Sequence, residues 1–133
     1  SGCDWSSDVC SSDLKKELIE ISKAYFKAFE EKNLDALKSM FTSDVSLIDW
    51  ENNITGINNV IAFNKDIFSE HKSINVQIKN IFCSPLDNVA LCNILIKLIK
   101  EEEEHDLSVI DILTFDSNGL IKQIKAQKSE QND

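Results

Sequence analysis

Two aspartates occupy positions where a strand pattern calls for apolar side chains. Asp111 lies inside the run Leu107–Leu113, and strand alternation places it on the same face as its apolar neighbours. Asp49 follows Val45 and Leu47 at the same alternating spacing. An ionised carboxylate on an apolar face costs several kcal/mol without a partner. Each aspartate must therefore be protonated or hydrogen-bonded.

Two polar residues on predicted helices complete a candidate site. Tyr25, the only tyrosine, lies on the apolar face of the first predicted helix, and a buried hydroxyl needs a hydrogen-bond partner. Asn64 is the polar exception on the apolar face of a later predicted helix. Together with Asp49 and Asp111 they could form the polar part of an apolar small-molecule pocket. The alternative is that Tyr25 and Asp111 satisfy each other in a closed core.

The surroundings of the two carboxyl groups suggest a division of labour. We expect Asp111 to be neutral at pH 7, because its strand neighbours are apolar and no basic residue lies within its strand. We expect Asp49 to be ionised, because the polar segment 51–53 beside it indicates solvent access. A carboxylate can remove a proton while a neutral carboxyl donates a hydrogen bond to the developing oxyanion.

Other kinds of site find little support in the sequence. The two histidines, His71 and His105, are not at a metal-ligand spacing, so we expect no metal site. Cys83 and Cys92 flank one predicted hairpin without facing each other, so we expect free thiols and a cytoplasmic protein. The sequence contains neither a Gly-rich phosphate loop nor a nucleophile elbow.

Composition excludes several classes of protein. The chain has 133 residues, 42% of them hydrophobic, which suits one globular domain. The net charge is −9, and all 14 basic residues are lysines, which argues against a nucleic-acid partner. The longest apolar stretches fall short of the roughly 18 residues of a membrane span, so we expect no membrane partner.

Residues 1–14 differ in composition from the rest of the chain. They contain no Ile, Lys or Asn, all of which are abundant from Lys15 onward. Reverse translation of residues 4–14 resembles a sequencing-adapter oligonucleotide, so we interpret residues 1–14 as a non-native segment outside the fold. Without its three acids the net charge becomes −6, and Cys3 and Cys10 drop out. We expect a single domain over residues 15–128 and a polar tail over residues 129–133.

Hydrophobic periodicity predicts an α+β protein in the order α-α-β-α-β-β-β-β. Helices are expected over residues 15–32, 34–41 and 57–68, the last capped by Thr55, and strands over residues 45–50, 73–82, 89–100, 106–115 and 120–127. A charged hairpin tip is expected over residues 101–105. The strand at 89–100 is apolar on much of both faces. Helices can cover one face and a second copy of the chain the other, so we expect a homodimer.

Several spaced motifs resemble the nuclear transport factor 2-like superfamily, in its SnoaL-like and ketosteroid isomerase-like branch. They are Tyr25-Phe26-x-Ala28-Phe29, Asn33-Leu34-Asp35-Ala36-Leu37, Phe41-Thr42-x-Asp44-Val45, Gly56 and Val109-Ile110-Asp111-Ile112-Leu113-x-Phe115-Asp116-x-x-Gly119-x-Ile121. The resemblance covers residues 15–128. It implies a cone: a curved, mostly antiparallel sheet wrapped around about three N-terminal helices, with a pocket at the open end.

The resemblance also implies roles for individual residues. In the ketosteroid isomerases a helix tyrosine and a late-strand aspartate bind the oxyanion, and an aspartate ending the first strand is the base. These positions match Tyr25, Asp111 and Asp49. The substrate-binding residues expected around them are Asn64, Trp50, Phe29, Val109 and Leu113. Asn64 replaces a second tyrosine and Trp50 replaces a proline, which argues against steroid substrates.

Three functions remain open at this point. The first is a cofactor-independent isomerase that moves a proton next to a carbonyl group. The second is a non-catalytic module that binds a small apolar or carbonyl-containing ligand in the same pocket. The third is a dimeric interaction domain whose polar groups are packed shut. Catalysis requires Tyr25, Asp49 and Asp111 around one cavity, binding requires only the cavity, and the third function requires neither.

Overall fold

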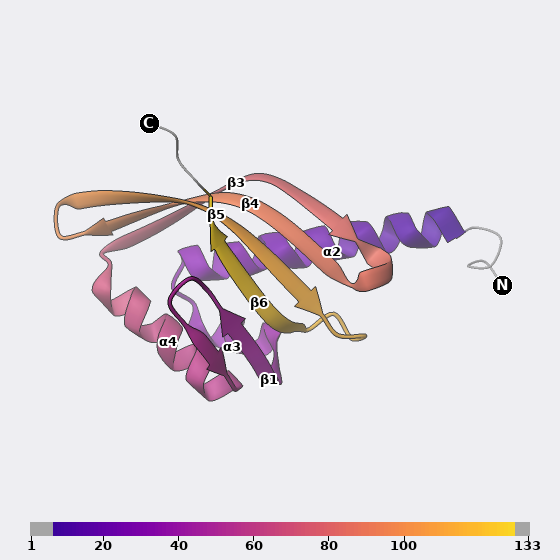
Figure 1. Ribbon diagram of the computed structural model, residues 1–133, viewed down its shortest axis with the longest axis horizontal. Coiled ribbons are helices and arrows are strands. Elements are labelled where there is room, and N and C mark those ends of the chain that lie inside the picture. Colours follow the sequence, from indigo (N-terminus) through magenta and orange to yellow (C-terminus); the bar gives the residue numbers. More distant parts are fainter. Residues whose placement is uncertain (1–6, 130–133) are drawn as a thin grey trace.

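The protein folds as an α+β domain, described by a computed structural model for residues 7–129 (Figure 1). The helices are α2 (Ser7–Glu30), α3 (Leu34–Met40) and α4 (Ile57–Glu70), with a short 3-10 helix η1 (Pro85–Asp87). The strands are β1 (Phe41–Ile48), β2 (Asn53–Thr55), β3 (Ser73–Ser84), β4 (Val89–Lys100), β5 (Glu103–Phe115) and β6 (Ile121–Lys128). The predicted fold class and element order are confirmed, with β2 as the one added strand.

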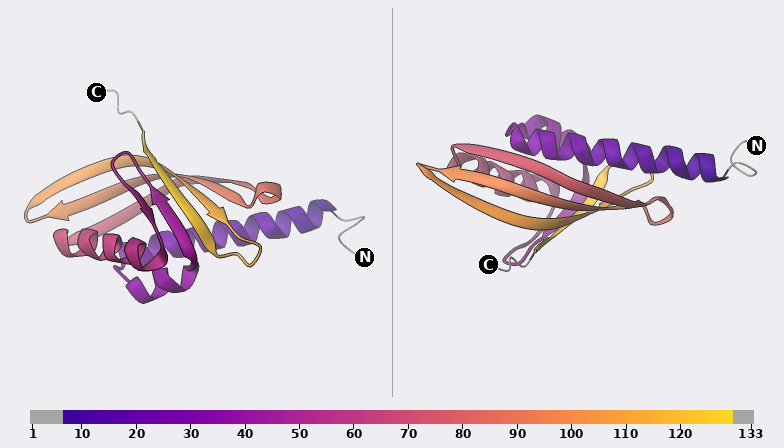
Figure 2. Two further views of the ribbon diagram at one scale, coloured as in Figure 1. Left: turned by 60° about the horizontal axis from the view of Figure 1, so that its bottom comes forward. Right: turned by 90° about the horizontal axis from the view of Figure 1, so that it is seen from above.

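All six strands belong to one curved, unclosed sheet in the order β2-β1-β6-β5-β4-β3. Strands β1 and β6 pair in parallel, and every other neighbouring pair is antiparallel. The mostly antiparallel sheet expected from the resemblance is therefore confirmed. The long strands β3, β4 and β5 bend across the molecule (Figure 2).

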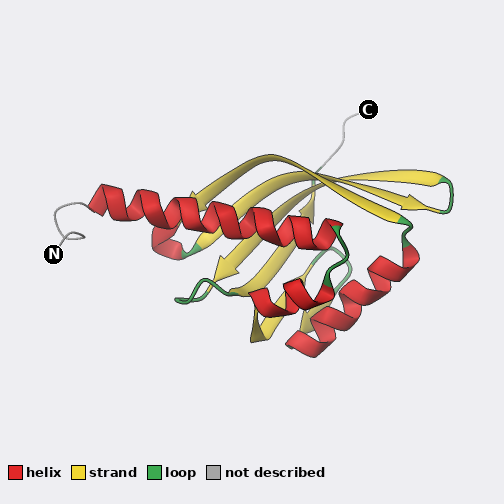
Figure 3. Ribbon diagram, turned by 180° about the vertical axis from the view of Figure 1, so that it is seen from behind, coloured by secondary structure: helices red, strands yellow, loops and turns green. Residues whose placement is uncertain are grey.

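The three helices cover the same face of the sheet (Figure 3). Helix α2 supplies Leu18, Tyr25 and Phe26 to the core at the spacing of one helical face. Their partners on the inner face of the sheet include Ile94 and Leu113, which are fully buried. The inner face of the sheet and the helical layer thus enclose the space in which the candidate site lies.

Helix α2 begins at Ser7 rather than at the expected Lys15. Residues 7–14 contain neither Gly nor Pro, so no residue type in this segment stops a helix from continuing toward the N-terminus. This end of α2 extends beyond the strands (Figure 1), and Leu14 is 48% exposed. Residues 1–6 and 130–133 lie outside the described residues, and the non-native origin of residues 1–14 stays a prediction.

The connection from β1 to α4 differs from the expectation. Strand β1 ends at Ile48, so Asp49 and Trp50 lie in the turn that follows, and β2 returns antiparallel to β1. The predicted N-cap Thr55 is wrong: Gly56 occupies the cap position, with φ 101°. Only glycine adopts this backbone conformation without strain. The Gly56 amide then donates a hydrogen bond to the Val45 carbonyl, which ties the helix start to β1.

The hairpin that joins β4 to β5 is tighter than predicted. Strand β5 begins at Glu103, so only Glu101 and Glu102 form the turn. Glu103 lies opposite Lys100 in the antiparallel register, an opposite-charge pair that favours extending the strands. The acidic tip predicted over residues 101–105 is therefore mostly strand.

The two described cysteines are free, as predicted. Cys83 lies opposite Ala90 in the β3–β4 ladder. Cys92 lies opposite Ile81, one residue from the expected position, because the ladder starts with Ser84 opposite Val89 and so centres the turn between Leu86 and Asp87 rather than on Leu86. The two thiols therefore do not face each other.

Candidate functional site

A cavity of about 100 Å³ lies between α2, α4 and the inner face of the sheet. Its polar side chains are Tyr25, Asp49, Asn64 and Asp111. Its apolar and aromatic walls are Phe29, Leu47, Trp50, Phe63, Ile67, Ile96, Val109, Ile124 and Ala126. Seven of the eight predicted site residues therefore line one cavity. The eighth, Leu113, lies fully buried in the core and lines no part of it.

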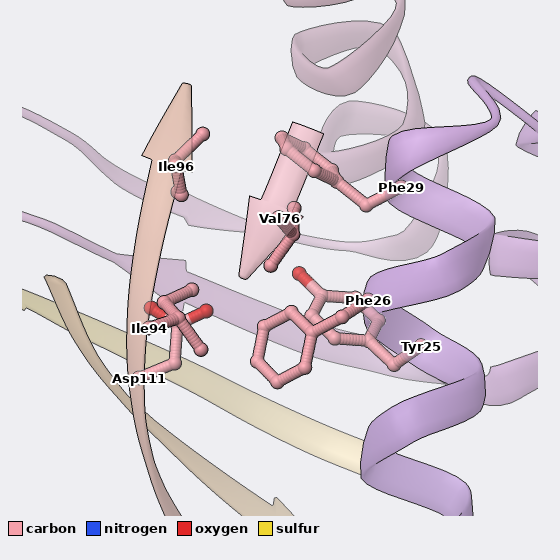
Figure 4. A pocket seen from close by; sticks show the side chains of 7 residues that line it. All are labelled: Tyr25, Phe26, Phe29, Val76, Ile94, Ile96 and Asp111. Atoms are coloured by element: carbon pink, nitrogen blue, oxygen red, sulfur yellow. The ribbon is translucent and has the colours of Figure 1, made fainter. Parts of the chain in front are cut away.

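Asp111 and Tyr25 approach the cavity from opposite sides, and Figure 4 shows their oxygen atoms pointing toward the same space. Asp111 is on the inner face of β5, opposite Cys92, and is 7% exposed. Within the described part of the chain neither side chain forms a hydrogen bond. The alternative in which the two groups satisfy each other in a closed core therefore lacks the contact it requires.

Burial raises the pKa of Asp111 to about 7, and the nearby charge of Asp49 contributes further to this rise. The sequence led us to expect a neutral carboxyl at pH 7. The upward direction of the pKa shift agrees with this expectation, and a pKa of about 7 means that the neutral and ionised forms of Asp111 coexist at pH 7. Burial also raises the pKa of Tyr25 well above its ordinary value, with the charge of Asp111 as the second cause. Tyr25 therefore remains a hydrogen-bond donor.

The ring of Tyr25 is held in place by aromatic neighbours. Its centroid lies 5.1 Å from that of Phe26 in an edge-to-face arrangement and 6.1 Å from that of Phe41. Such pairs favour defined ring orientations. The packing thus fixes the direction in which the Tyr25 hydroxyl points.

Asp49 is held very differently, by the turn that follows β1. Its Oδ1 accepts hydrogen bonds from the backbone N–H groups of Glu51 at 2.8 Å and Asn52 at 2.6 Å. The Asn52 side-chain amide lies 3.1 Å from Oδ1 and 3.2 Å from Oδ2. Oδ2 therefore has the greater unused accepting capacity, and it belongs to a residue that lines the cavity.

Asn64 presents an unpartnered amide at the cavity wall. The residue is 1% exposed, and its Nδ2 has no hydrogen-bond partner among the described residues. An unpaired buried amide costs free energy. A ligand that accepts a hydrogen bond at this wall would relieve that cost.

Trp50 lies in the same turn as Asp49 and is 42% exposed. The Nζ atom of Lys128 at the end of β6 lies 4.8 Å from its ring centroid, a cation–π distance. Because Trp50 both lines the cavity and meets solvent, it forms part of the rim.

A second, smaller cavity of about 40 Å³ is shown in Figure 4. Four residues line both cavities: Tyr25, Phe29, Ile96 and Asp111. The walls that only the smaller cavity has are Phe26, Val76 and Ile94. The two spaces thus adjoin each other at the Tyr25–Asp111 pair.

Sequence reasoning missed several wall residues. Leu47 could have been predicted as a wall residue, because it precedes Asp49 by two residues on the same strand face. Ile96 gave no signal, because β4 is apolar on both faces and periodicity does not tell them apart. Phe63 lies outside the predicted apolar stripe of α4, yet it lines the cavity together with Ile67, which follows one helical turn later.

Two further observations concern a metal ion and a membrane. Among the described residues, no group of three or more His, Cys, Asp or Glu side chains is arranged to hold a metal ion. Over the same part of the chain, no helix is long and apolar enough to cross a membrane.

Comparison with solved structures finds the same fold in several proteins. An LEH-like epoxide hydrolase of M. tuberculosis is 16% identical, with a TM-score of 0.77 over 86% of this chain and 84% of that one. A putative SnoaL-like polyketide cyclase from Jannaschia sp. is 14% identical, with a TM-score of 0.75 over 87% and 88%. A protein from Catenulispora acidiphila with a ketosteroid isomerase-like fold, in complex with trimethylamine, is 14% identical, with a TM-score of 0.72 over 80% and 83%.

A sequence comparison with curated proteins finds no match. The family model of the SnoaL-like domain matches residues 22–124, which include every lining residue of the larger cavity except Ala126. This span runs from the middle of α2 into β6 and confirms the resemblance seen in the sequence. The chain belongs to the SnoaL-like domain family.

Proposed function

We propose that this protein binds a small carbonyl compound and moves a proton on the carbon next to the carbonyl group, without a cofactor. The observation that supports this function best is that Tyr25, Asp49 and Asp111 line one cavity. Tyr25 and protonated Asp111 are buried hydrogen-bond donors. Asp49 is a partly solvated carboxylate whose Oδ2 can accept a further hydrogen bond or a proton. Members of this fold carry many activities, so the proposal depends on the site and not on the fold.

In the proposed reaction Asp49 removes a proton from the carbon next to the carbonyl. The electrons of the broken C–H bond form a carbon–carbon double bond, and the carbonyl π electrons move onto oxygen. Tyr25 and protonated Asp111 donate hydrogen bonds to that oxyanion. In a substrate with a carbon–carbon double bond beside that carbon, the intermediate is an extended dienolate. Asp49 then returns the proton to the far carbon of the dienolate, which restores the carbonyl and shifts the original double bond next to it.

The pKa of Asp111 predicts the pH dependence of this reaction. Only the protonated form donates a hydrogen bond, and burial raises its pKa to about 7. Activity should therefore fall as the pH rises through about 7, with Asp111→Asn, an amide donor, removing that decline.

The direct test is hydrogen–deuterium exchange at the carbon next to the carbonyl of 2-cyclohexenone, followed by NMR. Wild-type protein should catalyse exchange, and Asp49→Asn should reduce it by roughly 10²-fold or more, as is typical for loss of a general base. The same variant should retain or strengthen the binding of phenol, an enolate mimic, because a negative charge that faces the electron-rich phenol oxygen is removed. Exchange that is equally fast with Asp49→Asn would contradict the proposed role of Asp49.

A non-catalytic ligand-binding module is the second candidate, and the hydrogen bonds of Asp49 favour it. Oδ1 accepts two backbone N–H groups of the turn, which is a sufficient structural reason for an aspartate at this position. In this case phenol binds and wild-type protein catalyses no exchange. The third candidate, an interaction domain with a closed pocket, conflicts with the open cavity around the polar groups.

We further propose that the outer face of the sheet pairs with a second copy of the chain. The ladder aligns Phe82, Leu91 and Ile112 across β3, β4 and β5 on the face away from the helices. Phe82 is 61% exposed, and burying such side chains is favourable. Sedimentation should detect a dimer that Leu91→Lys weakens, and a strict monomer at high concentration would refute the pairing.

The two free thiols support a cytoplasmic location.

A further inference from the structure

The smaller cavity begins where the proposed oxygen site is located. Tyr25 and Asp111 are shared by both cavities, so a ligand oxygen bound between them has space on two sides. One side is the larger cavity with Asp49 and Asn64. The other is the chamber bounded by Phe26, Val76 and Ile94 (Figure 4), which we call the apolar chamber.

The apolar chamber is suited to a hydrocarbon group rather than to water. A buried water needs two to four polar partners. The polar side chains of this chamber are Tyr25 and Asp111, and a bound carbonyl oxygen would use both of them. The remaining walls are hydrocarbon, which favours an alkyl group.

The size of the two spaces limits the ligand. A cavity needs about 10–15 Å³ to hold a single water molecule. The apolar chamber, at about 40 Å³, therefore has room for about three carbon atoms. The larger cavity, at about 100 Å³, takes several more. The two together suit a molecule of about ten non-hydrogen atoms, much smaller than a steroid.

The charge of the walls limits the ligand as well. Two carboxyl groups and no lysine line the two cavities, and the chain contains no arginine. A ligand with an anionic group would meet like charge without a counter-ion. The walls therefore favour a neutral molecule.

The chamber wall on β3 is fixed to helix α2. Glu30 near the end of α2 accepts a hydrogen bond at 2.9 Å from the backbone N–H of Val76, and another at 2.9 Å from the side-chain amide of Asn75. The helix that carries Tyr25 is thus tied to the strand that carries Val76. This tie connects two walls of the chamber.

We propose that the substrate is a small neutral carbonyl compound with a short alkyl substituent on the carbonyl side that faces the apolar chamber, and that Val76 sets the length of that substituent. This inference rests on the proposed function. The reacting carbon then lies in the larger cavity with Asp49. Val76 acts as a specificity residue, since it contacts the substituent and no reacting atom.

The test is calorimetric binding of phenol and of 2-methyl-, 2-ethyl-, 2-propyl- and 2-butylphenol to the full chain. An alkyl group next to the hydroxyl is within reach of the apolar chamber. Wild-type affinity should rise about four-fold per added carbon as far as propyl, the increment expected for a buried methylene, and fall at butyl. Val76→Ala should move the optimum to butyl, and Val76→Leu should move it to ethyl or shorter. Circular dichroism checks that both variants are folded.

Ile67→Ala is the matched control, because Ile67 lines the larger cavity and not the apolar chamber. It should weaken all five phenols by a similar factor and leave the optimum at propyl. An affinity that does not vary with chain length, or an optimum that Val76 variants leave unchanged, would overturn the chamber inference alone. Failure of phenol itself to bind to wild-type protein would overturn the oxygen site, and with it both proposals.

Discussion

The two sides of the cavity hold their carboxyl groups in opposite ways. On the side of α2 and β5, Asp111 is buried and forms no hydrogen bond within the described part of the chain, and its pKa rises to about 7. On the side of the β1–β2 turn, Asp49 accepts hydrogen bonds from Glu51 and Asn52. An aspartate that is buried away from N–H groups and water favours the neutral, hydrogen-bond-donating form, whereas one that receives N–H groups favours the ionised, accepting form.

The largest expected effect concerns the stability of the buried side. Because folding raises the pKa of Asp111 from 3.8 to about 7, its contribution to stability is present below pH 4 and is lost as the pH rises through 7. The loss is roughly 4 kcal/mol, since one pKa unit corresponds to about 1.4 kcal/mol. Urea unfolding at pH 5 and pH 8 should show Asp111→Asn gaining on wild type at the higher pH. A difference in the free energy of unfolding that is the same at both pH values would mean that burial does not shift the pKa of Asp111.

The next effect concerns ligand binding at the same side. Asp111→Ala should weaken phenol binding by about 1–3 kcal/mol, the usual cost of losing a buried hydrogen bond. Calorimetry at pH 6, where wild-type Asp111 is mostly protonated, gives the comparison. Equal binding by the two proteins would leave Asp111 as a core residue with no ligand.

A smaller effect is expected on the turn side. Asn52→Ala removes the side-chain amide that contacts both Asp49 oxygens and keeps the two backbone hydrogen bonds. The free energy of unfolding should fall by about 1 kcal/mol. Phenol affinity should change little, because Asn52 does not line either cavity. A large loss of phenol binding would contradict this expectation and show that the turn also shapes the phenol-binding cavity.

The smallest effect is expected for removal of residues 1–14. These residues are interpreted as non-native, Leu14 is half-exposed, and the N-terminal end of α2 extends beyond the strands (Figure 1). Deletion should leave the melting temperature within experimental error. A loss of several degrees would show that the segment contributes to the fold.

The sequence predicted the sheet and most of the site because both depend on local patterns. Alternation placed Asp111 on the inner face of its strand, and the helical spacing of Tyr25 placed it on the inner face of α2. The sequence did not predict that Leu113 is sealed in the core, although it shares a face with Asp111, because depth along a curved sheet depends on how the helices cross it. The apolar chamber was also unpredicted, since Val76 and Ile94 differ in no local way from other core residues.

The most direct test of the account is a carbon-13 NMR titration of the Asp111 carboxyl in wild type and in Asp49→Asn. The account predicts that Asp111 titrates near pH 7 in wild type, because it is buried and faces the charge of Asp49. In Asp49→Asn its pKa should be lower, because that charge is gone. Titration near the ordinary value of 3.8, unchanged by Asp49→Asn, would contradict the claim that the two carboxyl groups share one cavity.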